Sequence, residues 1–202
     1  MTSRESSPCS AGARRVAVLT LLWPAVFGLP VKAQANDVVV LEYGHIHHMI
    51  EDQDPTPLLR IYQDGLVRVH YPVYMQRAGD YEFSLSAEEL VLLFESVEAE
   101  GLLLLDIQEA AAEREAIEAR QTAGGELFDV SDVTETVIRL RPSEVRGFSG
   151  VQASGGLLRT IRWPNVYTDA RRYPELASVQ SIAAVARRLQ EILDRAVQVG
   201  QP

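Results

Sequence analysis

LLRIYQDGLVRVHY, residues 58–71, decides the fold of this 202-residue chain. Two β-rich runs flank Asp64 and Gly65, an arrangement that is typical of a β-hairpin. The length of the turn fixes the register, because a slip of one residue moves every side chain to the other face of the sheet. A two-residue turn would mix apolar and charged side chains on both faces, whereas a three-residue turn over 63–65 separates them. We therefore predict the three-residue turn.

That register gives the hairpin one wholly apolar face. It pairs Ile61 with Val67 and Leu59 with Val69. Gly65 then takes the left-handed conformation of a β-bulge, which glycine adopts without steric cost. The apolar face is expected to pack against the core.

The opposite face of the hairpin carries charge. The register places Arg60 opposite Arg68, a repulsive pair unless an anion lies nearby. The same sorting, applied to the other expected strands, gives an outward-facing set of candidate ligand-binding residues: Arg60, Tyr62, Arg68, His70, Arg139, Arg141 and Arg162. Arginine forks suit carboxylate and phosphate groups, so this set indicates an anion-binding face. The alternative is internal neutralisation, by Glu82 and Glu135 on neighbouring strands or by the carboxylates of residues 106–121.

The rest of the chain supplies further strands and two amphipathic helices. Strands are expected within the stretches 38–49, 80–86, 134–141 and 157–163. Ser86 and Glu89 form a capping box ahead of a helix that ends at Gly101, and Tyr173-Pro174 opens the last helix. The fold class is therefore α+β, with an antiparallel sheet of about five strands and two helices packed on one face.

Residues 1–35 are typical of a signal peptide. Arg14 and Arg15 precede an apolar run, and Ala33 and Ala35 are the small residues that a signal peptidase requires. We predict cleavage after Ala35 and a periplasmic or secreted protein. A membrane anchor is the alternative, and the general secretory and twin-arginine routes both stay open.

The remaining residues, 36–202, are expected to form a single α+β domain. Within it, about 106–122 form an acidic helical insert or flap with few bulky apolar residues. The only cysteine, Cys9, lies in the signal segment, so thiol chemistry and sulfur-ligated zinc are excluded from the domain. The formal net charge of −9 argues against a nucleic-acid partner. The apolar run before Ala33 is too short and broken to give a stable membrane span.

Three histidines lie within LEYGHIHHMIEDQD, residues 41–54. In a strand, His45 and His47 would share one face, which allows them to chelate zinc or copper. Glu42 and Asp52 are the candidates that would complete this metal site. The preferred alternative is a polar strand edge on which both histidines are exposed.

The exposed-histidine alternative depends on which neighbours face the core. With Ile46 and Ile50 turned inward, His48 becomes partly buried and the other two histidines face solvent. A bulge at Gly44 would reverse this assignment.

The order of these elements resembles that of small secreted bacterial domains. The resemblance rests on the hairpin LRIYQDGLVRV, the capped helix LSAEELVLLFESVEAEGLL, a D-x-T-x-T lead-in at Asp132, Thr134 and Thr136, and a closing helix. It implies a fold and an export route, and no activity. The HIHH run and the acidic insert are not part of that pattern.

The sequence contains no G-x-S-x-G, P-loop, G-x-G-x-x-G after a strand, or H-E-x-x-H motif. We therefore expect a non-enzymatic, exported binding or accessory domain without a cofactor. Its partner would be an envelope component, either a protein or an anionic glycan or lipid headgroup. The alternatives are a zinc- or copper-binding protein and a hydrolase of envelope polymers.

Overall fold

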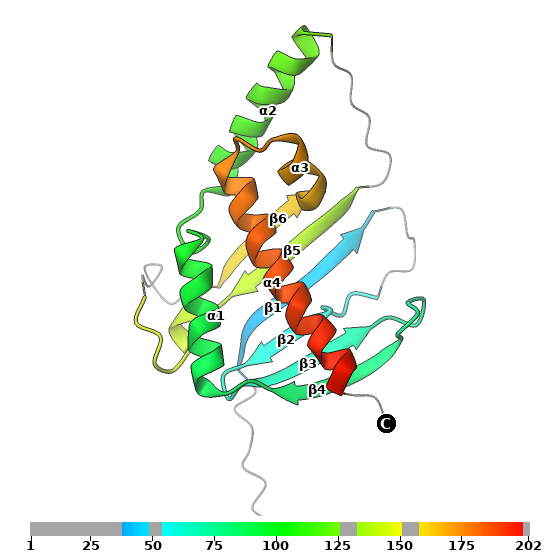
Figure 1. Ribbon diagram of the computed structural model, residues 1–202, viewed down its shortest axis with the longest axis vertical. Coiled ribbons are helices and arrows are strands. Elements are labelled where there is room, and N and C mark those ends of the chain that lie inside the picture. Colours follow the sequence, from blue (N-terminus) through cyan, green and yellow to red (C-terminus); the bar gives the residue numbers. More distant parts are fainter. Residues whose placement is uncertain (1–37, 49–53, 126–132, 151–157, 200–202) are drawn as a thin grey trace, which may run out of the picture. The chain divides into compact units, whose positions relative to one another are not determined.

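The computed structural model describes residues 38–48, 54–125, 133–150 and 158–199, all of which belong to one compact unit. The predicted signal segment, 1–35, lies outside the described residues. In chain order the elements are β1 (Val39–His47), β2 (Leu59–Tyr62), β3 (Leu66–Tyr71), β4 (Gly79–Ser84), α1 (Ala87–Ala99), α2 (Ile107–Ala123), β5 (Thr134–Leu140), a 3-10 turn (Pro142–Glu144), β6 (Arg159–Pro164), α3 (Val166–Arg172) and α4 (Ala177–Val199). The strands form one antiparallel sheet in the order β4-β3-β2-β1-β5-β6 (Figure 1).

The hairpin β2–β3 has the register that the three-residue turn predicts. Ile61 lies opposite Val67, and Arg60 lies opposite Arg68. Gly65 has a φ of 88°, in the left-handed region. The backbone N–H of Leu85 donates to the Gly65 carbonyl oxygen over 2.9 Å, so the turn also fixes where β4 ends.

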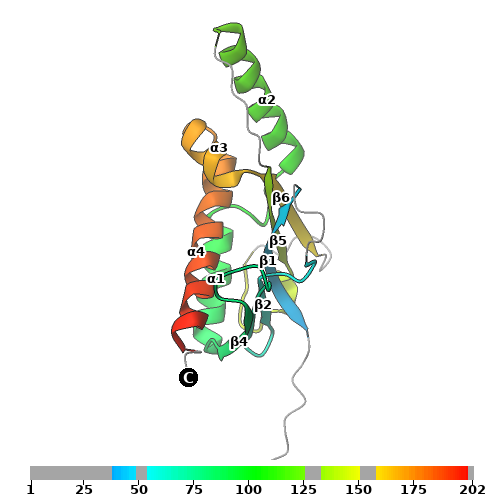
Figure 2. The ribbon, with the colours of Figure 1, turned by 90° about the vertical axis from the view of Figure 1, so that its right-hand side faces the viewer.

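One face of the sheet is covered by helices. Figure 1 shows α1 and α4 crossing the sheet, and Figure 2 shows both helices on the same side of it. The buried residues of α1 are Leu90, Leu93, Phe94 and Val97, which form one stripe of the helix. Each such side chain contributes about 1.5–3 kcal/mol on full burial, so this face holds the core.

The helix starts follow local capping chemistry. The Ser86 hydroxyl accepts from the Glu89 N–H over 3.1 Å, and the Glu89 carboxylate accepts from the Ser86 N–H over 2.7 Å, which confirms the predicted capping box. At the start of α2 the Asp106 carboxylate accepts from the backbone N–H groups of Gln108 and Glu109. The acidic insert is therefore a helix.

The α+β class is confirmed, but two details of the prediction are wrong. The sheet has six strands rather than about five, and the described residues contain four α-helices rather than two. α3 is only seven residues long, too short to show a helical period, and it follows Asn165 in a left-handed conformation with a φ of 49°. Within the described residues, no helix is long and apolar enough to cross a bilayer.

Candidate functional site

The sheet face opposite α1 and α4 carries the predicted arginines. Directly paired residues of antiparallel strands share a face, and the pairing joins Arg60 to Glu42 and Arg68, and Glu42 to Arg139. By the same alternation, Tyr62, His70 and Arg162 lie on this face. Arg141 follows β5 and is exposed beside Arg139. We call this surface the outer face.

Cross-strand carboxylates neutralise part of the outer face. Arg68 Nε donates to Glu82 over 2.7 Å, and Arg162 Nη1 donates to Glu135 over 3.3 Å. Arg68 also stacks on Tyr62, with the guanidinium carbon 5.1 Å from the ring centre. These two arginines have the internal partners that the alternative interpretation named.

The acidic insert does not contribute to this neutralisation. The ion pairs that join α2 to the rest of the described chain link Arg114 to Asp169 and Glu118 to Arg172, both on α3. In the described residues, no carboxylate of α2 pairs with an arginine of the outer face.

Glu42 is shared by two arginines. One of its carboxylate oxygens accepts from Arg139 Nη1 over 2.9 Å, and the other lies 3.4 Å from Arg60 Nε. Arg141 has no ion pair within the described part of the chain. Around Glu42 there are thus two guanidinium groups for one carboxylate, with a third cation nearby. The sequence had assigned Glu42 to a metal site instead.

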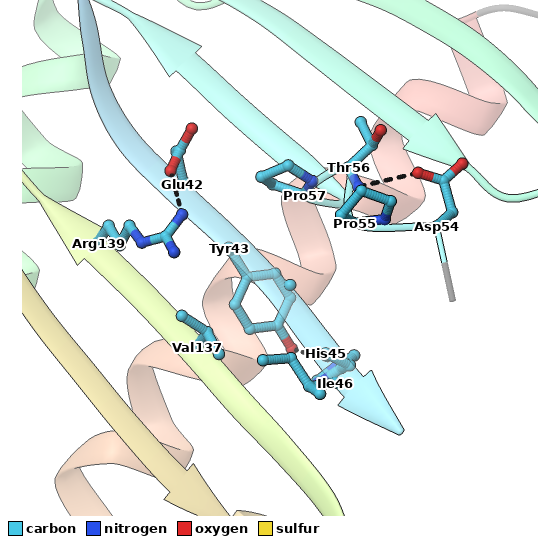
Figure 3. A pocket seen from close by; sticks show the side chains of 11 residues that line it. Glu42, Tyr43, His45, Ile46, Asp54, Pro55, Thr56, Pro57, Val137 and Arg139 are labelled. Carbon is cyan, nitrogen blue, oxygen red and sulfur yellow. Dashed lines mark hydrogen bonds and ion pairs between the residues drawn. The ribbon is translucent and has the colours of Figure 1, made fainter. Parts of the chain in front are cut away.

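A cavity of about 310 Å³ adjoins Arg139 (Figure 3). Gly44 is one of the residues that line it. Its apolar walls are formed by Ile46, Val137, Pro55 and Pro57, and the ion pair of Arg139 with Glu42 closes one end. We call it the Gly44 cavity.

The segment 54–57 separates the Gly44 cavity from a second cavity of about 270 Å³ beside Arg60 and Arg68. His70 holds this segment. Its Nε2 lies 2.8 Å from an oxygen of Asp54, and its Nδ1 lies 2.6 Å from an oxygen of Asp80.

His70 and Asp54 each shift the pKa of the other. The hydrogen bond with Asp80, and then that with Asp54, raises the pKa of His70. Hydrogen bonds from Thr56 and His70 lower the pKa of Asp54 to about 2. An imidazole whose charged form is favoured by two carboxylates therefore joins the segment 54–57 to β3 and β4.

His45 and His47 share a face, as predicted, but the face is the helix-covered one. The Tyr43 hydroxyl lies 3.1 Å from His45 Nε2, and Thr136 Oγ1 lies 3.4 Å from His45 Nδ1. Burial, and then the charge of His47, lowers the pKa of His45 to about 4. The expectation that these histidines are exposed on a strand edge is wrong, because Ile46 faces outward into the Gly44 cavity and His48 is the exposed member.

The structure does not bring the predicted metal ligands together. Glu42 lies on the outer face and His45 and His47 on the other, so the sheet separates them. Asp52 and Ile50 lie outside the described residues. Among the residues that are described, no group of three histidine, cysteine or acidic side chains is arranged to hold a metal ion.

The Gly44 cavity was not foreseen, because it depends on the segment 54–57 lying beside β1 and β5. The local signal was Val137, an apolar residue that alternation with Arg139 places on the outer face. Comparisons with protein families, with curated proteins and with solved structures find no match for this chain. Its function is therefore inferred from the geometry of the outer face.

Proposed function

We propose that this protein is an exported binding domain that recognises an anionic envelope component through its outer face. The observation that carries the proposal is the shared carboxylate of Glu42. Arg60 and Arg139 both depend on it, at 3.4 and 2.9 Å. A second anion, supplied by a ligand, would complete the pairing of these guanidinium groups.

The exposure of these groups supports the proposal. The side chains of Arg60 and Arg139 are 37% and 38% exposed, while that of Glu42 is 23% exposed. Guanidinium groups that are exposed to this extent keep some N–H donors open to a ligand. Because they are partly buried, salt weakens their interaction with an anion less than it would at a fully exposed site. Because the chain as a whole is acidic, an anionic ligand needs a local excess of cations, such as the one around Glu42.

Export remains part of the proposal. The segment 1–35 has the charged, apolar and small-residue regions of a signal peptide, which would deliver the domain to the periplasm or the medium. An envelope glycan, lipid headgroup or protein carboxylate would then be the available anion.

Cosedimentation with the cell-envelope fraction of the producing organism tests the proposal. We compare the mature protein with Arg60→Glu/Arg139→Glu, and use Arg187→Glu/Arg188→Glu as the matched control because both arginines are exposed on α4, away from the outer face. The proposal predicts salt-sensitive binding that the double variant loses and the control retains. Equal binding by a folded double variant would contradict it, as would the absence of any binding by the wild type.

A further inference from the structure

The Gly44 cavity combines one cationic end with apolar walls, a combination that the neutralised parts of the outer face lack. From this we infer that the cavity binds a small monocarboxylate with an apolar body. The inference deepens the proposed function, because it assigns a ligand class to one part of the outer face.

The cationic end is provided by Arg139. Its Nη1 donates to Glu42, and its remaining N–H groups have no hydrogen bond to the described residues. A planar guanidinium with free donors matches the two oxygens of a carboxylate. Since the cavity adjoins this guanidinium, a bound carboxylate can approach it from the side opposite Glu42 (Figure 3).

The walls call for an apolar body. Val137 points outward from β5, yet only 9% of it is exposed, and Ile46 is half-buried beside it. Pro55 and Pro57 line the facing side and carry no N–H donors. Water beside these apolar side chains gains few hydrogen bonds, so an apolar group of the ligand would replace it favourably there.

Size and charge restrict the ligand further. A volume of about 310 Å³ corresponds to about ten water molecules. Glu42, which lines the cavity beside Arg139, would repel a second negative charge. A monoanion of about six to twelve non-hydrogen atoms fits both limits.

Such a carboxylate has two sources, a free short-chain acid or the C-terminal residue of a peptide. Calorimetric titration of the mature protein separates them with hexanoate and N-acetyl-leucine. The matched uncharged probes are hexanamide and N-acetyl-leucinamide. We expect at least one acid to bind, and its amide to bind at least about tenfold more weakly because the charged hydrogen bonds are lost.

Two variants test the location. Arg139→Gln should weaken binding of the acid by about tenfold or more, while Arg195→Gln, which removes an arginine paired with Glu89 on the helix side of the sheet, should leave it unchanged. Gly44→Leu should abolish it by filling the cavity. A Cβ at Gly44 would lie 3.5 Å from Pro57 Cα and from Leu58 N, which is ordinary contact, so the strand should tolerate the change. Gly44→Val serves the same purpose if Gly44→Leu does not fold.

The outcomes separate this inference from the proposed function. Failure of both acids to bind the folded wild type, or binding that survives in Gly44→Leu, would overturn the inference. If envelope binding through Arg60 and Arg139 still held, the proposed function would stand without it. The wild type could instead bind an acid that Gly44→Leu no longer binds and yet fail to bind the envelope fraction. That result would support the cavity site and overturn the proposed function.

Discussion

Ile61 on β2 lies directly opposite Val67 on β3, and both side chains are fully buried beneath the helices. Because side chains alternate along a strand, this pair places their neighbours Arg60 and Arg68 on the outer face. The core and the candidate binding surface therefore depend on the same register. That register is set by the turn that ends at Gly65.

Gly65→Ala is expected to destabilise the protein strongly. Gly65 has a φ of 88°, and a Cβ there would lie 2.3 Å from the Leu85 carbonyl oxygen, so the backbone must shift. Gly101→Ala is the control, because Gly101 has a φ of 74° with nothing within 4 Å of an added Cβ. Urea unfolding should give a loss of about 1–2 kcal/mol for the control and a clearly larger loss for Gly65→Ala. Equal losses would show that the close approach at Leu85 carries no energy.

His45 is expected to limit stability in acid. Its pKa is about 4 in the folded protein, lowered first by burial, against about 6.5 when unfolded. The neutral imidazole therefore contributes fully above pH 6.5, and its contribution falls as the pH drops from 6.5 towards 4. In wild type this loss of unfolding free energy amounts to roughly 1–3 kcal/mol, and His45→Gln should remove it. Urea unfolding at pH 4.5 and 7 measures the difference. The same loss of stability at pH 4.5 in His45→Gln as in wild type would contradict the role of His45.

His70 should have the opposite effect. Its hydrogen bonds with Asp80 and Asp54 raise its pKa, so its contribution to stability is full below pH 6.5 and is lost as the pH rises through the raised value. His70→Gln removes the titrating group, so it should abolish this loss of stability at higher pH. The loss of stability in acid that is due to His45 should remain. NMR titration of the imidazole gives the pKa directly. A pKa below that of a model histidine would contradict the hydrogen bonds of His70 with Asp54 and Asp80.

Metal binding by the histidine pair is expected to be weak. Both ring nitrogens of His45 already face hydroxyl groups, those of Tyr43 and Thr136. Glu42 cannot reach the pair from the outer face. Calorimetric titration with zinc and copper should give no heat at micromolar metal. A heat that disappears in His45→Ala/His47→Ala would instead support the metal-binding alternative.

The parts of the fold that the sequence predicted are those that local chemistry specifies. The turn at Gly65 and the capping box of Ser86 and Glu89 each depend on residues a few positions apart. Because side chains alternate along each strand, Arg60 and Arg139 could both be assigned to the outer face without knowledge of the strand order. These elements needed no tertiary information.

The site could be predicted only in part, because its remaining features are non-local. Ile46 is apolar and was placed in the core, but the Gly44 cavity gives it an apolar surrounding on the outer face. Glu42 and His45 lie three residues apart, which looked compatible with a metal site, yet an odd spacing in a regular strand puts them on opposite faces. The sharing of Glu42 by Arg60 and Arg139 required the order β2-β1-β5, which no local pattern reveals.

The central claim is that Glu42 occupies arginines that an external anion would otherwise bind. Cosedimentation of Glu42→Gln with the envelope fraction gives the sharpest test, with Glu118→Gln as the control, because Glu118 is likewise shared by two arginines, Arg114 and Arg172, away from the outer face. We expect Glu42→Gln to bind more tightly than wild type at low salt, because an internal competitor is gone, and the control to bind like wild type. Weaker or unchanged binding by a folded Glu42→Gln would contradict it.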